Sequence, residues 1–117
     1  MANPTVTELR LSSDKRRLTV AFDTGDRFEP SAQLLRIESP SAEVQGHDPS
    51  QKTIVPGKRD VAIAGIEPVG NYAVRLIFDD GHDTGIFSWD VLHRLGSGHD
   101  DLLAAYRAKL AEGGLPE

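Results

Sequence analysis

Cysteine is absent from the 117-residue sequence, which excludes disulfides, thiolate zinc sites, cysteine nucleophiles and iron–sulphur ligation by this chain alone. Long apolar runs are absent too, since no window approaches the roughly 18 residues of a membrane-spanning helix. The first residues, MANPTVTELR, contain neither the basic nor the apolar segment of a secretory signal. We therefore expect a soluble, cytoplasmic protein with no membrane partner.

Basic side chains are scarce relative to acidic ones, with 13 Lys and Arg against 18 Asp and Glu. The net charge of -5 arises entirely after residue 60, where 4 basic residues accompany 9 acidic ones. This balance argues against nucleic acid as the main partner. An acidic second half could favour a cationic partner or a metal, although solubility alone explains it.

The hydrophobic pattern predicts a single α+β domain, and 117 residues suit one core. Alternation with a period of two predicts strands at 6–11, 17–22, 27–29, 61–66, 72–78 and 84–87. Helical spacing predicts helices at 32–37, 41–45 and 89–95, and a last one from about 100 to 113. The expected architecture is small antiparallel hairpins or a sheet, with short helices packed on it and a C-terminal helix.

Single residues predict where several of these elements begin and end. Ser31 and Ser88 are expected as helix N-caps, and Asp100 or Asp101 as the cap of the last helix. Gly96 is expected to end the helix at 89–95. A turn is predicted at Glu67-Pro-Val-Gly, residues 67–70.

A stretch rich in proline and glycine, residues 46–60, follows neither period and predicts an irregular loop. With no partner in view the loop is expected to be disordered, and it could become ordered on binding. We assign residues 1–96 to the domain and residues 97–117 to a C-terminal helical extension of the same compact unit.

Four histidines are the main candidates for chemistry, and three of them, His47, His82 and His99, precede an aspartate. His99 and Asp101 match the start of a two-histidine, one-carboxylate iron site, but no later histidine completes such a site. Helix capping is therefore the favoured role for the aspartates that follow His99. His82 lies in the turn between two predicted strands, where its imidazole either bonds local backbone or contacts a ligand or partner. His93 is expected on an exposed helix face. Neither a serine-nucleophile motif nor a phosphate loop is present.

The segment VGNYAVRLIFDDGHDTGIFSWDVL, residues 69–92, resembles the hallmark segment of the gamma-butyrobetaine hydroxylase-like N-terminal domain family. The earlier FEPSAQLLR, residues 28–36, resembles the stretch that leads to a Leu-Arg pair in that family. The resemblance spans about residues 5–96. It implies a small α+β domain that occurs in carnitine-pathway hydroxylases dependent on 2-oxoglutarate and iron, and as short bacterial proteins. Relatives are also fused to P-loop ATPases that carry iron–sulphur clusters.

For the hydroxylases, the resemblance implies a structural zinc held by a Cys-x-Cys-x-x-Cys run and the turn histidine. Here the cysteine positions fall on Ser39, Ser41 and Val44, while the histidine is retained as His82. Hydroxyls and a valine cannot replace thiolates on zinc, so we expect the family zinc site to be lost and no cofactor to be held.

The resemblance also implies that the catalytic domain of the hydroxylases lies outside these residues, so we expect no enzyme activity. The leading hypothesis is an interaction or adaptor domain, linked to iron–sulphur cluster assembly and partnered by an iron–sulphur carrier ATPase. Its partner face is predicted at Asp79, Asp80 and Asp83, with the loop at 46–60 as the second choice.

Three alternatives stay open. One is a metal-binding accessory protein that holds iron or zinc on His82, with Asp80, Asp83 or Glu43 in place of cysteine. A second is a component of a 2-oxoglutarate dioxygenase system. The third is an enzyme in its own right, for which the sequence offers no coherent set of catalytic residues. The sequence does not indicate the oligomeric state.

Overall fold

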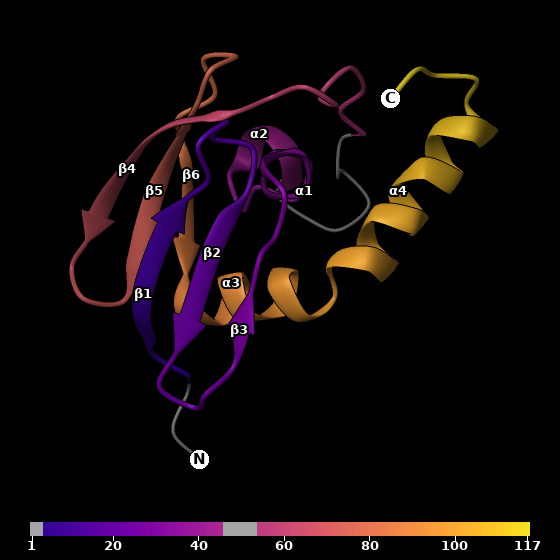
Figure 1. Ribbon diagram of the computed structural model, residues 1–117. Helices are drawn as coiled ribbons and strands as arrows, with labels where there is room; N and C mark the ends of the chain where they lie inside the picture. The colour runs from indigo at the N-terminus through magenta and orange to yellow at the C-terminus, as the bar shows by residue number, and fades with distance from the viewer. Residues whose placement is uncertain (1–3, 46–53) are drawn as a thin grey trace.

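The structure, a computed structural model, describes residues 4–45 and 54–117. Within these ranges the chain passes twice through the order strand, strand, strand, helix, helix (Figure 1). The first half contains β1 (Val6–Leu11), β2 (Leu18–Phe22), β3 (Arg27–Phe28), α1 (Ala32–Ile37) and α2 (Ala42–Gln45). The second contains β4 (Ile63–Val69), β5 (Ala73–Phe78), β6 (Gly85–Ser88), α3 (Trp89–Ser97) and α4 (His99–Glu112).

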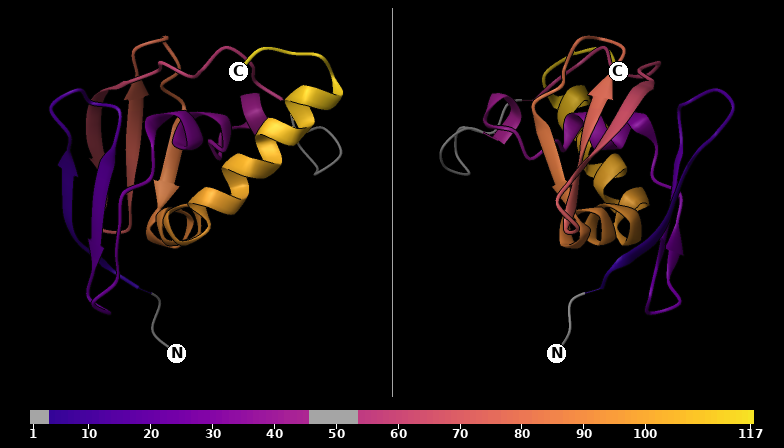
Figure 2. Two further views of the ribbon diagram at one scale, coloured as in Figure 1. Left: turned by 45° about the vertical axis from the view of Figure 1, so that its right-hand side comes forward. Right: turned by 90° about the vertical axis from the view of Figure 1, so that its left-hand side faces the viewer.

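Each half forms its own antiparallel sheet, with the strand orders β1-β2-β3 and β4-β5-β6. Figure 2 shows the two sheets diverging from each other, with α4 extending away from both. A backbone hydrogen bond of 2.8 Å from Ile63 N–H to Lys15 C=O connects the β1–β2 turn to the start of β4. The predicted α+β architecture is confirmed, with two small sheets rather than one.

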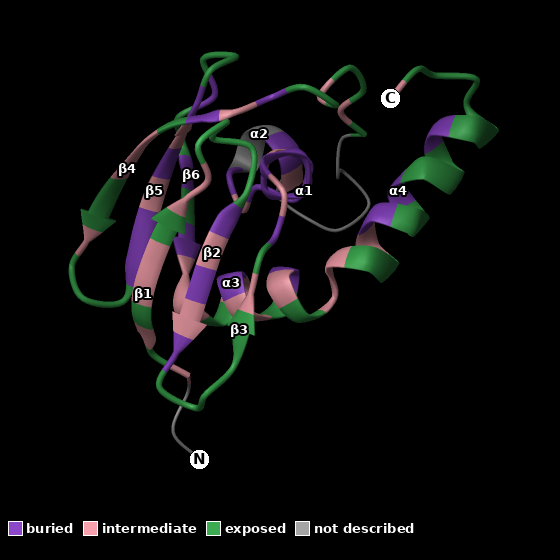
Figure 3. Ribbon diagram, viewed as in Figure 1, coloured by how far each residue is buried: buried purple, intermediate pink, exposed green. Residues whose placement is uncertain are grey.

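Both sheets bury one face in a common core, whose buried segments are purple in Figure 3. The alternation expected from the sequence places Leu18, Val20 and Phe22 of β2 in that core. β5 contributes Val74, Leu76 and Phe78, and the helices fill the space between the sheets. Full burial of one such side chain contributes roughly 1.5–3 kcal/mol, so the shared core is the main stabilising term.

The C-terminal helix α4 belongs to this core through Leu103, Tyr106 and Leu110. The Tyr106 hydroxyl also donates a hydrogen bond of 2.6 Å to the Val55 carbonyl. Residues 54–60 have neither helix nor strand, as predicted, yet this bond attaches them to α4. The rest of the predicted loop, residues 46–53, lies outside the described residues. No helix in the described part of the chain has the length and apolar character needed to cross a membrane.

Two serine caps are confirmed, because the hydroxyl of Ser31 accepts from Leu34 N–H at 3.2 Å and that of Ser88 accepts from Val91 N–H at 3.3 Å. The predicted turn at 67–70 is wrong, since Pro68 continues β4 opposite Val74. β4 is an edge strand, where a proline without an N–H is tolerated.

Helix α3 continues through Gly96 to Ser97, so the predicted stop at Gly96 is also wrong. A Cβ atom on Gly96 would lie 2.7 Å from Cβ of Phe28, which shows that this glycine allows α3 to approach β3. The N-cap of α4 is Gly98, and the predicted caps Asp100 and Asp101 lie within its first turn. There their charges favour the positive end of the helix dipole.

We predict that Gly96→Ala lowers the free energy of unfolding by about 1–3 kcal/mol, measured by chemical denaturation, because the added methyl group overpacks the contact with Phe28. Gly113→Ala is the matched control. The nearest neighbouring atoms would lie 3.6 Å from a Cβ at position 113, which is an ordinary contact distance. We therefore expect Gly113→Ala to change the free energy of unfolding by no more than about 0.5 kcal/mol. Equal effects of the two substitutions would contradict the packing role of Gly96.

Candidate functional site

The β5–β6 turn places His82 beside the connector between α1 and α2. His82 Nε2 is hydrogen-bonded to Ser39 Oγ at 2.9 Å, although the two residues are 43 positions apart. Both side chains are buried, with Ser39 fully enclosed. The expectation that this imidazole bonds local backbone therefore misses its main described contact, which joins two distant segments.

All four positions that the resemblance assigns to a zinc site, residues 39, 41, 44 and 82, are buried. Their donor set does not fit zinc, because Val44 has no donor atom and two neutral hydroxyls replace thiolates. Ser41 Oγ is buried without a hydrogen-bond partner. Among the described side chains, which exclude that of Glu43, no three His, Cys, Asp or Glu residues are grouped to hold a metal ion.

Asp80 is the centre of a partly buried ion-pair network at the same turn. Its Oδ2 accepts hydrogen bonds from Arg36 Nε at 2.8 Å and from Lys58 Nζ at 2.6 Å, and its Oδ1 accepts from His82 N–H at 3.0 Å. Burial raises the pKa of Asp80, but the hydrogen bonds from Lys58, His82 and Arg36 outweigh burial and lower this pKa to about 2. The carboxylate thus fastens the turn to α1 and to residue 58.

The other two aspartates of the predicted partner face also have contacts within the chain. Asp79 Oδ1 accepts a hydrogen bond of 3.1 Å from Ala62 N–H. Arg75 donates a hydrogen bond of 2.8 Å to the Asp83 carbonyl, and its guanidinium lies 3.6 Å from the Asp83 carboxylate. The structure therefore brings Asp79, Asp80 and Asp83 together at one turn, where each stabilises local structure.

His93 packs against the rings of both Phe22 and Phe28, at centroid distances of 5.0 and 5.3 Å. Its Nε2 is 3.0 Å from Asp26 Oδ2, and this hydrogen bond is the main reason why the pKa of Asp26 is lowered. The prediction of an exposed face is wrong, because the aromatic rings and Asp26 cover much of this imidazole. His93 connects α3 to the β2–β3 turn.

His99 makes contacts that the sequence analysis missed. Its Nε2 is 3.0 Å from Ser31 Oγ and its Nδ1 is 2.9 Å from Asp100 Oδ1. The order Ser, His, Asp matches that of a nucleophile, base and orienting carboxylate. However, Ser31 Oγ already accepts from Leu34 N–H, and the Asp100 side chain is fully exposed. The arrangement therefore caps α1 and attaches α4 to it.

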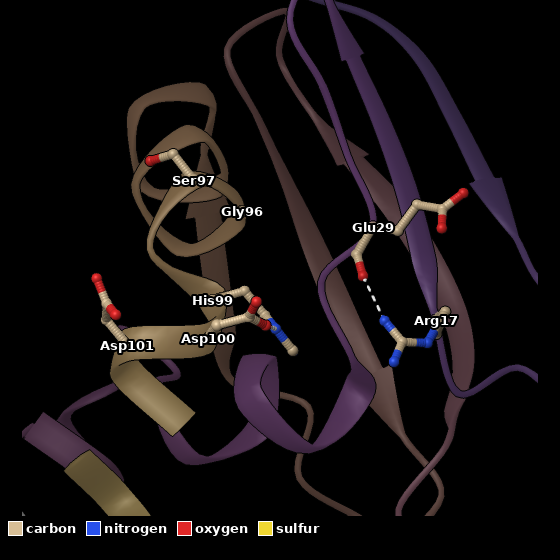
Figure 4. A pocket seen from close by; sticks show the side chains of 7 residues that line it. All are labelled: Arg17, Glu29, Gly96, Ser97, His99, Asp100 and Asp101. Carbon is tan, nitrogen blue, oxygen red and sulfur yellow. Dashed lines mark hydrogen bonds and ion pairs between the residues drawn. The ribbon is translucent and has the colours of Figure 1, made fainter. Parts of the chain in front are cut away.

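His99 also lines an open hollow of about 420 Å³, together with Arg17, Glu29 and residues 96, 97, 100 and 101 (Figure 4). Arg17 donates to the Glu29 carbonyl at 3.0 Å, and Asp101 points away from His99. The iron-site pairing of His99 with Asp101 is therefore not formed. His47, the remaining histidine with an adjacent aspartate, lies outside the described residues.

A second open hollow, of about 410 Å³, lies between residues 57–61, Asp79, Asp80 and Glu117. Lys58 and Asp80 pair across it. Glu117 is held by Arg107, and the hydrogen bond from Arg107 lowers the pKa of this carboxyl. Lys58 and Asp80 are thus paired within the hollow, whereas Glu117 is paired with a residue outside its lining.

The double β-β-β-α-α arrangement and the buried corner at His82 define a small α+β domain without a described metal centre. The family model for gamma-butyrobetaine hydroxylase-like, N-terminal, matches residues 9–93. The chain belongs to this family.

Solved structures agree with this assignment. Two solution NMR structures are 49% and 40% identical to the chain, cover 96% and 98% of it and 83% and 90% of their own length, and give TM-scores of 0.82 and 0.84. A crystal structure from Acidithiobacillus ferrooxidans ATCC 23270 is 36% identical, covers 81% of this chain and 98% of its own, and gives a TM-score of 0.67. It is described as a protein with unknown function of the DUF971 family. No curated protein matches the chain.

We predict that Asp80→Asn lowers the free energy of unfolding at neutral pH by about 1–3 kcal/mol, because two cationic donors lose their charged acceptor. In the unsubstituted protein, the stabilisation from the low pKa is complete above the ordinary value of 3.8 and is lost as pH falls towards about 2. Denaturation curves of Asp80→Asn should therefore depend less on pH in that window.

Asp60→Asn is the control for this prediction, because it removes the same charge nearby. Asp60 is 81% exposed and lies 3.9 Å from Arg16, so the expected change is at most about 0.5 kcal/mol. An Asp80→Asn protein as stable as Asp60→Asn, with unchanged acid dependence, would contradict the network described here.

Proposed function

We propose that this chain is a non-catalytic protein-binding module and that it binds through the outer face of the β4-β5-β6 sheet. One observation carries the proposal. Ile77 and Ile86 on this face belong neither to the core nor to the hydrophobic residues packed against it. Ile86 is 47% exposed, and contiguous exposed apolar surface is typical of interaction sites.

Strand geometry places these side chains on one surface. Val74, Leu76 and Phe78 of β5 face the core, so the alternate residues Arg75 and Ile77 face outward. Ile86 of β6 pairs with Arg75. We define the outer face by Arg75, Ile77 and Ile86.

The polar centre of the outer face is neutralised within the chain. Arg75 donates a hydrogen bond of 2.6 Å to Glu67, which is the main reason why the pKa of Arg75 is raised. Arg75 also donates to the Asp83 carbonyl. Apolar side chains beside a paired arginine are typical of protein interfaces, where charges at the centre are few and arginine is favoured.

The polar clusters support binding rather than catalysis. Catalysis requires groups that converge on a substrate and hold a reactive protonation state. In the described residues, His82, His93 and His99 each have a side-chain contact that joins structural elements. In one open hollow Arg17 donates to the Glu29 carbonyl, and in the other Lys58 pairs with Asp80.

The first partner to test is a P-loop ATPase that carries an iron–sulphur cluster, as the resemblance to ATPase-fused domains suggests. A domain joined to such an enzyme in one protein is a reasonable candidate to bind it when the two are separate chains. On this proposal, the chain contributes recognition to cluster assembly, while the ATPase supplies the nucleotide and cluster chemistry.

We predict that Ile86→Asp weakens binding of the purified chain to a purified iron–sulphur carrier ATPase by at least about tenfold, measured by calorimetry, because it buries a charge at the contact. Leu115→Asp is the matched control. Leu115 is 42% exposed and lies outside the outer face. The Leu115→Asp chain should therefore bind the ATPase with unchanged affinity.

Circular dichroism should give folded spectra for both variants. Equal binding of Ile86→Asp and the unsubstituted chain would overturn the assignment to the outer face. No binding by the unsubstituted chain would overturn the ATPase as partner.

A further inference from the structure

Ser39, Ser41, Val44 and His82 form a corner that is buried, as structural zinc sites are, but that lacks the donor atoms zinc requires. A closed zinc site needs four nitrogen, sulphur or oxygen ligands, and one of these four residues has none to offer. The corner must therefore be stabilised by other interactions, and the contacts around Ser39 identify them.

Ser39 is fitted closely into this corner. A Cβ atom on Gly85 would lie 2.3 Å from Ser39 Oγ, so the hydroxyl occupies space that any other residue at position 85 would fill. Ser39 Oγ accepts from Ser41 N–H at 3.4 Å, and the side chain of Gln45 donates to the Ser39 carbonyl at 3.0 Å. The hydroxyl thus has a fixed position opposite the imidazole.

The His82 side of the corner is also held by charged side chains of the chain itself. Its backbone N–H donates to Asp80, and Asp80 accepts in turn from Arg36 of α1. The α1 segment and the β5–β6 turn are therefore joined twice, by Ser39 with His82 and by Arg36 with Asp80. Both connections span more than 40 residues of sequence, so each closes a long loop.

We infer that the hydrogen bond between Ser39 and His82 is a metal-independent clasp that fastens the α1–α2 connector to the β5–β6 turn. Hydroxyl and imidazole hold the two segments at the positions where the resemblance places thiolates, histidine and zinc. Folding of this chain consequently requires no divalent metal and is insensitive to thiol oxidation. The buried, unpaired Ser41 Oγ marks a position that a second ligand would occupy and that the clasp does not use.

The first test measures the full chain in thermal denaturation with and without a strong chelator, and in native mass spectrometry as purified. We expect the chain mass without metal and a Tm that the chelator leaves unchanged. Ser39→Ala should lower the Tm by about 4–10 °C, because it removes a buried hydrogen bond. Ser97→Ala, an exposed serine of α3, is the control and should leave the Tm within about 2 °C.

A metal retained in stoichiometric amount, or a Tm lowered by the chelator, would overturn the clasp. A Ser39→Ala protein as stable as Ser97→Ala would also overturn it. Since neither the chelator arm nor mass spectrometry uses a variant, the proposal remains falsifiable if Ser39→Ala does not fold.

The second test restores three thiols at this corner with the substitutions Ser39→Cys, Ser41→Cys and Val44→Cys. We expect this triple variant to bind one zinc ion and to gain Tm when zinc is added, with a loss of both on adding His82→Ala. Cysteines at Ser12, Ser13 and Ser97 are the control and should give no zinc-dependent Tm. A folded triple variant without a zinc response would overturn the equivalence of clasp and metal positions.

Discussion

The structure depends on one constraint, which is that neither three-stranded sheet can bury enough apolar surface alone. The apolar face of a sheet must be buried against another layer of secondary structure. β2 and β5 supply the buried faces, and helices from both halves fill the space between them. The two halves therefore stabilise each other through a common core, and the C-terminal helix enlarges that core through Leu103, Tyr106 and Leu110.

The polar residues follow from this arrangement. Segments from different halves meet at the edges of the core, and a charged or hydrogen-bonded pair joins them there. The side-chain hydrogen bonds that join the halves include Arg36 to Asp80, Ser39 with His82, Asp26 with His93 and Ser31 with His99. Side chains that look chemically promising in the sequence thus connect structural elements in the described part of the chain.

Local signals predicted most of the fold, because alternation and capping act within a few residues. Ser31, Ser88 and the buried positions of β2 and β5 needed no tertiary information. The errors at Gly96 and Pro68 arose where tertiary context decides, since Gly96 depends on Phe28 and Pro68 on an edge position. The contact of His82 with Ser39 could not be predicted from spacing, because 43 residues separate them. Only the resemblance placed these two positions at one site.

The outer edge of β4, which pairs with no other strand among the described residues, has a further consequence. Pro68 removes one N–H from that edge, and an irregularity in pairing between Ile63 and Gly65 interrupts its regular spacing. An extended peptide seeking to add a strand there would lack a continuous row of backbone partners. Copies of this chain are correspondingly protected from stacking β4 against β4 into a growing sheet. A partner that binds on this side, as we propose, would therefore contact side chains on the face of the sheet rather than its edge.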